Sequence, residues 1–428
     1  MAWDFETSPE FGKKLDWARD FVREEIFPLE TLDLDWHSYR AIIKPLSEQV
    51  RQQGLWAAHL GPELGGQGYG QVHLALLHEI LGASEYAPPV FGNQAPDSGN
   101  SELIAIAGTQ EQKDRWMHPL LDGTMYSAFS MTEQGTGSDP RQLRTSAIRD
   151  GDEWIINGTK WMVGNASQSD FHILMARTDL TPDANPYRAM SMFIVPSRNA
   201  GVAVREIGLM HDPDSRGPVH THGEVRYENV RVPGDHLLGG AGEGFALAQS
   251  RLGPGRIHHC MRWVGVCRRA FDALCERAVS KSVHGSTLAE KQTIQNWIAD
   301  SAAAMEAARL LTLQAAWKLD REGAKAARAE IAMIKYFGAA VMHDVLDRAL
   351  QIHGSLGYSC DMPIEQMYRW ARASRLYDGP DEVHRVTVAR QILRGYEPHD
   401  VPSEHLPTRR AAAQAKYAGA LAALSAGN

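Results

Sequence analysis

The 428-residue sequence predicts a mostly helical α+β fold in which a small β-domain lies between two helical domains. Three changes of pattern predict it. Apolar residues recur at helical spacing to about residue 122, short strand-like runs follow, and long helical periodicity returns at about 241. We therefore expect an N-terminal helical domain at 1–125, a central β-domain at 126–240, a C-terminal domain like a four-helix bundle at 241–398 and a tail at 399–428.

The N-terminal domain is predicted from apolar residues that return after one helical turn. Leu76 and Leu77 are followed by Ile80 and Leu81. A glycine-rich loop at 61–68 interrupts this pattern and predicts a break between helices.

The β-domain is predicted from short runs with strand character that are separated by Asp-Gly, Asn-Gly and proline-containing turns. These runs lie at 154–156, 171–175, 192–195 and 224–227. In the C-terminal domain, Ala-rich segments at 299–317 and 324–350 predict long helices. The tail carries an Ala-rich stretch at 410–426 that we expect to be helical only when docked.

Composition and charge argue against several classes of protein. The net charge of −8 gives no basic patch for nucleic acid, and 38 Gly with 21 Pro is too little for a low-complexity chain. The N-terminus lacks the pattern of a secretion signal or a transit peptide, and no apolar run reaches the roughly 20 residues that cross a bilayer. The four cysteines form no C-x-x-C pair, so we expect free thiols and a cytoplasmic protein.

Two segments carry residues suited to catalysis. In 375–384, Asp378 precedes a glycine turn and a helix start, where its carboxylate can act as a base or can cap the helix. Far upstream, the loop 129–139 is rich in glycine and hydroxyl groups. Its Gly135 and Gly137 let backbone amides approach a planar ring or a phosphate, although the loop also fits a plain turn.

These two segments, in this order and within a helix–strand–helix layout, resemble the acyl-CoA dehydrogenase family over about residues 10 to 396. The resemblance implies FAD as the cofactor and Asp378 as the base that removes the α-proton of an acyl-CoA thioester. It further implies hydride transfer from the β-carbon to flavin N5, which yields a trans-2-enoyl-CoA. Electron-transferring flavoprotein or a similar acceptor would then reoxidise the flavin.

The resemblance assigns the loop 129–139 to the flavin. Thr132 would bind the pyrimidine edge of the ring, with Phe129, Met131 and Gly137 close by. Ser138 would meet either the cofactor pyrophosphate or the arm of the CoA thioester, which makes it a candidate for both cofactor and substrate binding.

A second stretch departs from the family pattern. Trp161 directly follows Lys160, whereas Met162 occupies the usual Trp position and Gly164 replaces a hydroxyl residue. Trp161 is therefore either a flavin-packing residue or a core residue of a strand.

Other cofactor contacts are implied to come from a neighbouring subunit. Lys281 stands at the family's usual Arg and keeps the charge without the two-pronged geometry. The resemblance assigns five residues of the neighbouring subunit to FAD, namely Lys281, Gln292, Gln351, Gly354 and Ser355. It also assigns Glu382, which follows the base in the sequence, to the cofactor. Gly354 also fits a simple helix stop. If the likeness holds, the protein must be a homodimer or a homotetramer.

The substrate side of the predicted site contains Arg256, which the resemblance places beside the thioester, and Gly379. Since Pro380 has no N–H group, the amide of Asp378 or Gly379 would donate to the thioester oxygen. Some family members carry a catalytic Glu at the position of Gly255, where this chain has no side chain. We expect the dry site to raise the pKa of the base.

Histidine pairs in the chain do not predict a metal site. His258 and His259 would point about 100° apart on a helix and cannot share one ion. His220 and His222 have strand spacing but lack a third nearby ligand.

Within the family, the runs around Arg256 and Asp378 look closest to a subgroup that in some organisms is fused to an aminoglycoside-phosphotransferase-like kinase domain, with Ser250 as a departure. That subgroup is associated with long or branched acyl chains and with 4-hydroxyacyl-CoA breakdown through a phosphorylated intermediate. Two alternatives remain open: a nitroalkane-oxidising flavoenzyme with an Asp base, and a non-catalytic acyl-CoA-binding member.

Overall fold

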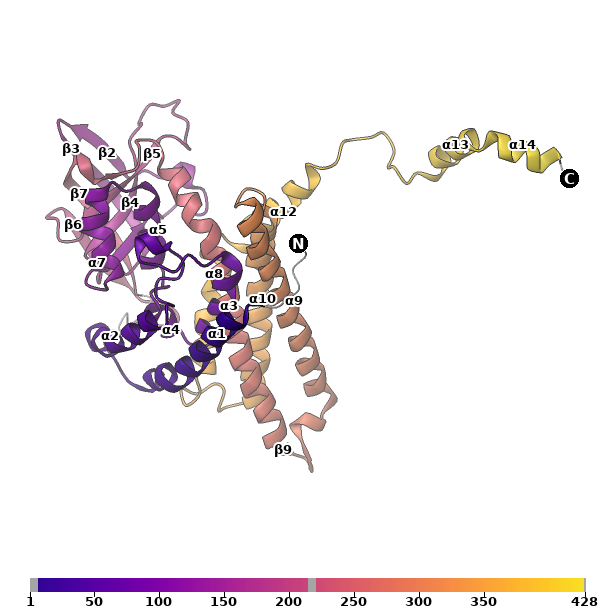
Figure 1. Ribbon diagram of the computed structural model, residues 1–428, viewed down its shortest axis with the longest axis horizontal. Coiled ribbons are helices and arrows are strands. Elements are labelled where there is room, and N and C mark those ends of the chain that lie inside the picture. The colour runs from indigo at the N-terminus through magenta and orange to yellow at the C-terminus, as the bar shows by residue number, and fades with distance from the viewer. Residues whose placement is uncertain (1–6, 215–220, 427–428) are drawn as a thin grey trace. The chain divides into compact units, whose positions relative to one another are not determined.

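The computed structural model of the protein describes residues 7–214 and 221–426. The chain up to Arg385 forms one compact unit, and a second, small unit begins at Val386. Within the first unit, short helices come first, a β-sheet follows and long helices return (Figure 1). The mostly helical α+β fold predicted from the sequence is confirmed.

Short helices form the N-terminal part of the compact unit. Ser8 caps α1 by accepting a hydrogen bond from the Phe11 amide at 3.2 Å, and Asp35 caps α2 through the Ser38 amide at 2.7 Å. The helices are α1 (Pro9–Phe21), α2 (Trp36–Gln52), α3 (Gln71–Leu81), α4 (Ala87–Val90), α5 (Asp97–Ala107), α6 (Gln110–Gln112) and α7 (His118–Leu121).

The predicted apolar face of α3 is buried, with Leu77 and Leu81 fully inaccessible. The glycine-rich loop before α3 does separate two helices, as predicted. A glycine is required at Gly66, because a Cβ there would lie 2.1 Å from the carbonyl oxygen of Leu60.

The central part of the chain forms a sheet in the order β6-β7-β3-β2-β4-β5-β8, with β1 paired in parallel on β4. The four predicted runs lie in β3, β4, β5 and β7. The strands are β1 (Ser127–Ser130), β2 (Ser146–Asp150), β3 (Glu153–Gly164), β4 (Phe171–Arg177), β5 (Met190–Pro196), β6 (Val202–Ile207), β7 (His222–Pro233) and β8 (Leu237–Leu238). The sequence missed β1, β2, β6 and β8, which are short or largely exposed and lack a clear apolar alternation.

Long helices form the C-terminal part of the compact unit, as the Ala-rich segments predicted. They are α8 (Gly244–Ser280), α9 (Gln292–Glu322), α10 (Arg328–His353), α11 (Ile364–Ala371) and the start of α12 (Asp381–Leu393), with a small hairpin of β9 (Ser282–Val283) and β10 (Ser286–Thr287) after α8. The 37 residues of α8 span about 55 Å. Trp263 of α8 lies against Gly338 of α10, where a Cβ would be 3.4 Å from the indole ring.

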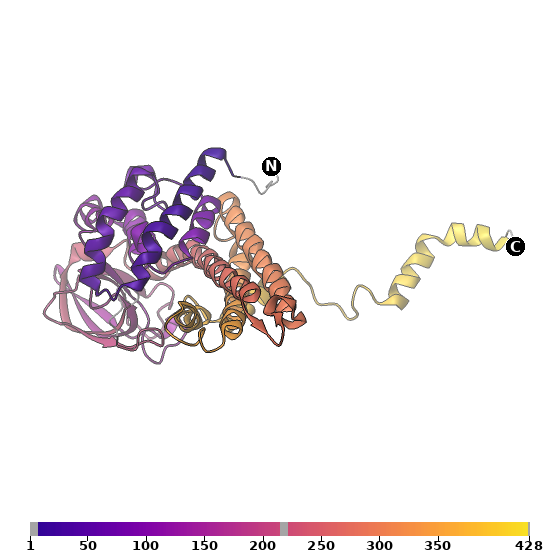
Figure 2. The same cartoon turned by 90° about the horizontal axis from the view of Figure 1, so that it is seen from below.

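The N-terminal and C-terminal helices pack on one another, with the sheet to one side (Figure 2). Helix α3 packs on both α8 and α9, and α5 packs on α8. Because α8 contacts the short helices, the other long helices and β5, it is the element on which the parts of the compact unit meet.

The second unit contains α13 (Leu406–Lys416) and α14 (Ala418–Ala426), so the stretch expected to be helical only when docked is helical without buried residues. Every described residue of these two helices is exposed. The compact unit ends at Arg385, whereas the tail was predicted to begin at 399. Within the described ranges, no helix is long and apolar enough to cross a membrane.

Candidate active site

The backbone at Asp378 is held in an unusual conformation by side chains from other helices. Asp378 has a φ of +53°, in the left-handed region that non-glycine residues rarely adopt. Arg256 of α8 donates from Nε to the Asp378 carbonyl oxygen at 3.0 Å, and His384 of α12 lies 3.1 Å from the same oxygen. This carbonyl therefore fixes the direction of the residue predicted to be the base.

The next residue must be glycine for two reasons. Gly379 has a φ of +99°, and a Cβ there would lie 2.8 Å from Nε2 of His384. Among the described residues, the amides of Asp378 and Gly379 donate to no protein acceptor. Both N–H groups are therefore available to a ligand.

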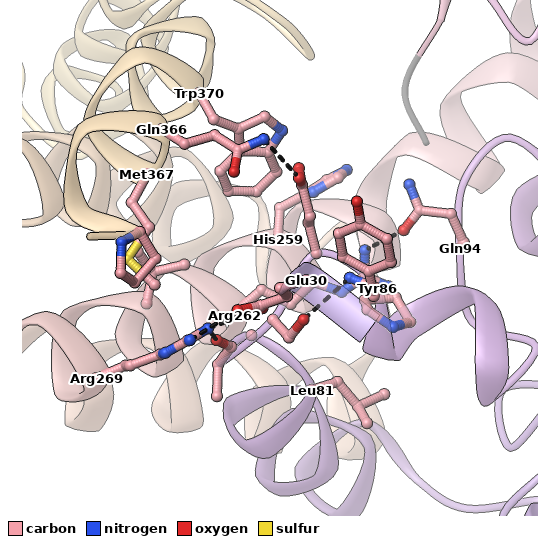
Figure 3. A pocket seen from close by; sticks show the side chains of 17 residues that line it. Glu30, Leu81, Tyr86, Gln94, His259, Arg262, Arg269, Gln366, Met367 and Trp370 are labelled. Carbon is pink, nitrogen blue, oxygen red and sulfur yellow. Dashed lines mark hydrogen bonds and ion pairs between the residues drawn. The ribbon is translucent and has the colours of Figure 1, made fainter. Parts of the chain in front are cut away.

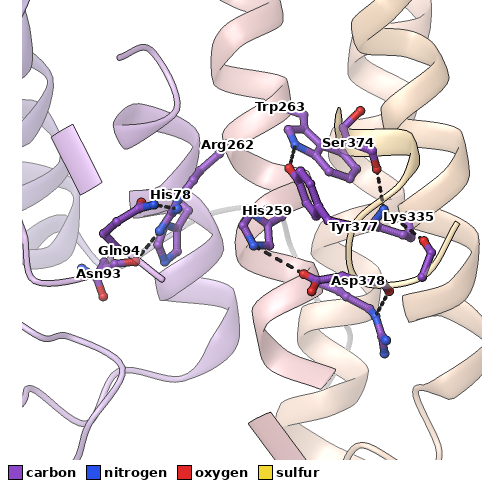
Figure 4. A network of polar contacts seen from close by, with 12 residues as sticks. His78, Asn93, Gln94, His259, Arg262, Trp263, Lys335, Ser374, Tyr377 and Asp378 are labelled. Carbon is purple, nitrogen blue, oxygen red and sulfur yellow. Dashed lines mark hydrogen bonds and ion pairs between the residues drawn. The ribbon is translucent and has the colours of Figure 1, made fainter. Parts of the chain in front are cut away.

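The carboxylate of Asp378 faces α8 rather than bulk solvent. Its Oδ2 lies 3.5 Å from Nε2 of His259, and its side chain is 22% exposed (Figure 4). The ring of His259 in turn contacts Tyr377 at 5.1 Å between centroids. The candidate base is thus half-buried, and part of its side chain stays accessible.

The charges around Asp378 keep it ionised. Burial alone would raise the pKa of this carboxyl, but the positive charges of His259, Arg256, Lys335 and Arg251 outweigh that effect and leave the pKa below its ordinary value. The rise predicted from the sequence was wrong, because that argument considered the dry surroundings and not the cations. Burial lowers the pKa of His259 to about 4, so at neutral pH the arginines and the lysine supply the positive potential.

The two adjacent histidines point to different partners, as predicted. His258 stacks on His78 with ring centroids 4.4 Å apart and lies 3.0 Å from the Gln71 side chain, whereas His259 faces Asp378. Sequence analysis considered His259 as a metal ligand and did not link it to Asp378. Its position three residues after Arg256, on the same helical face, is the signal that could have linked it to the base.

The loop predicted to hold a flavin is fixed by a buried ion pair. Lys160 of β3, fully inaccessible, lies 2.8 Å from Oε1 of Glu133 and donates to the Met131 carbonyl oxygen at 2.8 Å. Glu133 also accepts hydrogen bonds from the amides of Arg144 and Thr145 at 2.7 and 2.9 Å. One carboxylate therefore ties the loop after β1 to both β2 and β3.

The same loop presents open polar groups on its other side. Thr132, Gly137 and Ser138 are exposed, and both Gly135 and Gly137 have positive φ with nothing within 4 Å of a Cβ position. Hydroxyl groups and backbone amides that face open space form a cradle that fits a planar ring with a phosphate arm.

The predicted partner of that loop, Trp161, lies beside it. The Trp161 amide donates to the Thr132 carbonyl oxygen at 2.8 Å, and the indole is half-buried. The register of β3 against β7 shifts between Lys160 and Val163, and Met162 has a φ of +55° and is 40% exposed. The departure from the family pattern thus coincides with a β-bulge, which redirects the side chains at this point.

Arg251 connects the loop to the base. Its guanidinium lies 4.1 Å from the centre of the Phe129 ring, and its charge lowers the pKa of Asp378. Both predicted halves of the site therefore face the first part of α8.

The residues assigned to a neighbouring subunit gather at the other end of the helical bundle. Lys281 follows α8, Gln292 begins α9, and Gln351, Gly354 and Ser355 end α10; all five are exposed. Lys335 and Gln351 are 16 residues apart on α10, which is about 24 Å. These groups cannot reach a ring beside Asp378 of the same chain.

Gly354, with a φ of +64°, also ends α10. Glu382, in contrast, is exposed in the first turn of α12, beside the base.

His259 is one of the residues that line an open-sided pocket of about 670 Å³, mouth included (Figure 3). Four α8 residues on one face line it, namely His259, Arg262, Val266 and Arg269; the segment 81–88 and α11 supply the other walls. The Arg262 side chain bonds to the Asn93 carbonyl oxygen, to Gln94 and to His78, and it makes no ion pair with a described carboxylate. The α8 wall of the pocket is therefore polar, and Glu30, which pairs with Arg269, and Glu85 also line the pocket.

The part of the chain that the structure describes contains no group of three or more metal-ligating side chains. His222 lies in β7, and His220 lies outside the described residues.

Comparisons with known proteins match the whole of the compact unit. Family models of the acyl-CoA dehydrogenase N-terminal, middle and C-terminal domains match residues 9–124, 128–230 and 242–393. "Probable acyl-CoA dehydrogenase FadE2" of Mycobacterium tuberculosis is 41% identical over 91% of this chain and 93% of its own length. A solved Mycobacterium abscessus protein that is described as an acyl-CoA dehydrogenase is 36% identical, with a TM-score of 0.85 over 92% of this chain and all of the other.

A further relative is longer than this chain. "Acyl-CoA dehydrogenase family member 11" of Rattus norvegicus is 38% identical over 88% of this chain, which spans only 49% of that protein.

We expect Lys160→Met to lower the free energy of unfolding by about 3–5 kcal/mol, because Glu133 would remain buried without its cation. The control is Arg231→Met, which removes an arginine that is 51% exposed and paired with Asp150 and Glu153, so its effect should be about 0–1 kcal/mol. Urea unfolding of both variants measures the difference. Equal losses in the two variants would mean that the buried pair does not organise the loop.

Proposed function

Because the chain belongs to the acyl-CoA dehydrogenase family, we propose that it converts an acyl-CoA thioester to a trans-2-enoyl-CoA in an FAD-dependent reaction, with Asp378 as the α-proton base. Membership makes the protein an oxidoreductase that acts on CH–CH groups. The observation that carries the assignment of the base is the carboxylate itself, which is kept ionised in a fixed loop and lies 3.5 Å from His259, a residue that lines the pocket.

The low pKa of Asp378 suits a base that must be unprotonated before substrate arrives. A bound acyl chain would cover the exposed part of this carboxylate. Loss of water disfavours the charged form, so the proton affinity of Asp378 rises when the α-carbon is in place. Asp is one methylene shorter than Glu, and the left-handed turn at residue 378 supports the view that the backbone supplies the missing reach.

The thioester oxygen needs a donor as negative charge develops on it. We assign this role to the free amides of Asp378 and Gly379, since Pro380 has none. Arg256 reaches the Asp378 carbonyl oxygen, so its contribution on the substrate side is to hold the base in place.

FAD is the cofactor of the family, and when bound it accepts the hydride from the β-carbon. In this chain, the open loop would hold its ring and phosphates through Thr132, Gly137 and Ser138, with Trp161 alongside. Phe129, Met131 and Glu382 complete the groups that we assign to it from one subunit.

The remaining cofactor residues are the basis for proposing an oligomer. These residues are Lys281, Gln292, Gln351, Gly354 and Ser355. They lie at the end of the bundle where α10 ends, and Gln351 is about 24 Å along α10 from Lys335, so a second subunit is needed to bring equivalent groups to this site. We propose a homodimer or homotetramer that passes electrons to electron-transferring flavoprotein or a similar acceptor in the cytoplasm.

The polar pocket wall supports a substrate whose acyl tail carries an oxygen substituent. Arg262 is 6% exposed, and its surroundings contain neutral amides and histidines rather than a carboxylate. A hydroxyl or phosphate on the tail could accept from this guanidinium. We therefore propose that the chain belongs to the kinase-associated subgroup, with 4-hydroxyacyl-CoA or its phosphorylated form as a candidate substrate.

A panel of plain, branched and 4-oxygenated acyl-CoAs, mixed with the protein under argon, tests the substrate. We expect bleaching of the flavin absorbance by acyl-CoAs, and the fastest bleaching by those with an oxygen on the tail. Nitroethane belongs in the same panel, since an Asp base also fits the nitroalkane alternative. Bleaching by nitroethane alone would overturn the dehydrogenase proposal, and a colourless protein that cannot be reconstituted with FAD would favour the non-catalytic alternative.

Asp378→Asn should leave FAD bound and slow flavin reduction by acyl-CoA about 10²–10⁴-fold, because an amide cannot take the α-proton. Stopped-flow absorbance and the ratio of FAD to protein measure the two effects separately. The matched control is Asp361→Asn, which alters an exposed carboxylate in the same domain. Wild-type reduction rates in Asp378→Asn would show that another group is the base.

Gly255→Glu should partly restore activity to Asp378→Asn, by about tenfold or more over the single variant. Gly255 lies one helical turn before His259 on α8, and nothing stands within 4 Å of a Cβ at this position. A longer carboxylate there has room to approach the same substrate. If the double variant binds FAD but remains at the rate of the single one, position 255 does not face the α-carbon.

A further inference from the structure

Lys335, in the first half of α10, is a buried cation without a carboxylate partner. Its side chain is fully inaccessible, and the described part of the chain offers no acidic group within ion-pair distance. Burial lowers the pKa of this lysine. A buried ammonium group is costly, and an apolar side chain of similar size would avoid that cost. The charge therefore needs an explanation beyond packing.

The contacts of Lys335 lie on the loop that carries the base (Figure 4). Its Nζ donates to the carbonyl oxygen of Ser374 at 2.5 Å and lies 3.4 Å from that of Gly379. Those two carbonyls bracket Asp378. The rings of Trp263 and Tyr377 enclose the ammonium group at 5.2 and 5.1 Å from their centres.

We propose that Lys335 is a positioning residue for the base: its ammonium group ties both ends of the 374–379 loop to α10 and brings a positive charge to the loop that carries Asp378. This inference rests on the proposed function. The tie explains how a non-glycine residue stays in a left-handed conformation, since the loop is anchored on each side of it. The enclosing rings explain how the ammonium tolerates burial.

Other groups also face this carboxylate, so the lysine is one of several. Arg251, Arg256 and His259 approach from α8, and His384 approaches from α12. Lys335 itself faces Cys260, Asp378 and Asp381. Because burial keeps both histidines neutral at pH 7, removing Lys335 leaves two arginines as the permanent cations near the base.

Two variants separate the two roles of Lys335, which are its hydrogen bonds to the 374–379 loop and its positive charge near Asp378. Lys335→Gln keeps a donor and similar volume but loses the charge, whereas Lys335→Met loses both. Reduction of the flavin requires ionised Asp378, so its rate falls as pH drops through the pKa of that carboxyl. Loss of the cation raises this pKa, and we expect the acid limb of the rate to move to higher pH by about 1 unit in both variants.

Lys335→Met should also slow flavin reduction at its pH optimum about 10–100-fold, since a small displacement of the base is costly. Hydrogen exchange followed by mass spectrometry should show faster exchange in peptides covering 374–384 in this variant than in the Gln variant. Lys325→Met, in the exposed turn before α10, is the control and should leave both measurements unchanged.

An acid limb in Lys335→Gln that coincides with that of the wild type would overturn the charge role, and unchanged exchange in Lys335→Met would overturn the tie. If Lys335→Met does not fold, the Gln variant still tests the charge. Hydrogen exchange does not require turnover. If no acyl-CoA reduces the flavin of the wild-type protein, the proposed function is wrong, and hydrogen exchange still tests whether Lys335 anchors the 374–379 loop.

Discussion

The carbonyl oxygen of Asp378 is the point on which the arrangement of the site depends. Side chains from α8 and α12 converge on this oxygen and hold residue 378 in the left-handed region. That conformation turns the carboxylate toward His259, which lines the pocket, and among the described residues it leaves two amides of the same loop without a protein acceptor. In the proposed reaction, this conformation gives the shorter acid its reach toward the acyl chain.

The fold could be predicted from the sequence where periodicity was strong. The long Ala-rich helices and the four apolar runs of the sheet were found, because each has a clear repeat of 3.6 or 2 residues. Strands β6 and β8 were missed for physical reasons. The first is exposed along most of its length, and the second has only two residues and is held by pairing with β5.

Within the candidate site, sequence reasoning proposed the base and the loop but did not predict their surroundings. Spacing could assign Asp378 and Thr132 through a family resemblance, yet it could not show that Lys335, 43 residues upstream of the base, donates to the loop beside it. The direction of the pKa shift at Asp378 was misjudged for the same reason, since cations from distant parts of the chain determine it. Charges that meet only in three dimensions leave no periodic signal.

The buried pair of Glu133 and Lys160 has a consequence for how a cofactor would be acquired. Because this carboxylate already fastens its loop to two strands, the cradle keeps its shape before anything occupies it. Binding of a flavin then costs little conformational entropy, because the loop is already ordered, and the contacts with the loop contribute more fully to affinity. The loop in the β-domain should therefore keep its conformation in the apoprotein and remain able to bind the cofactor.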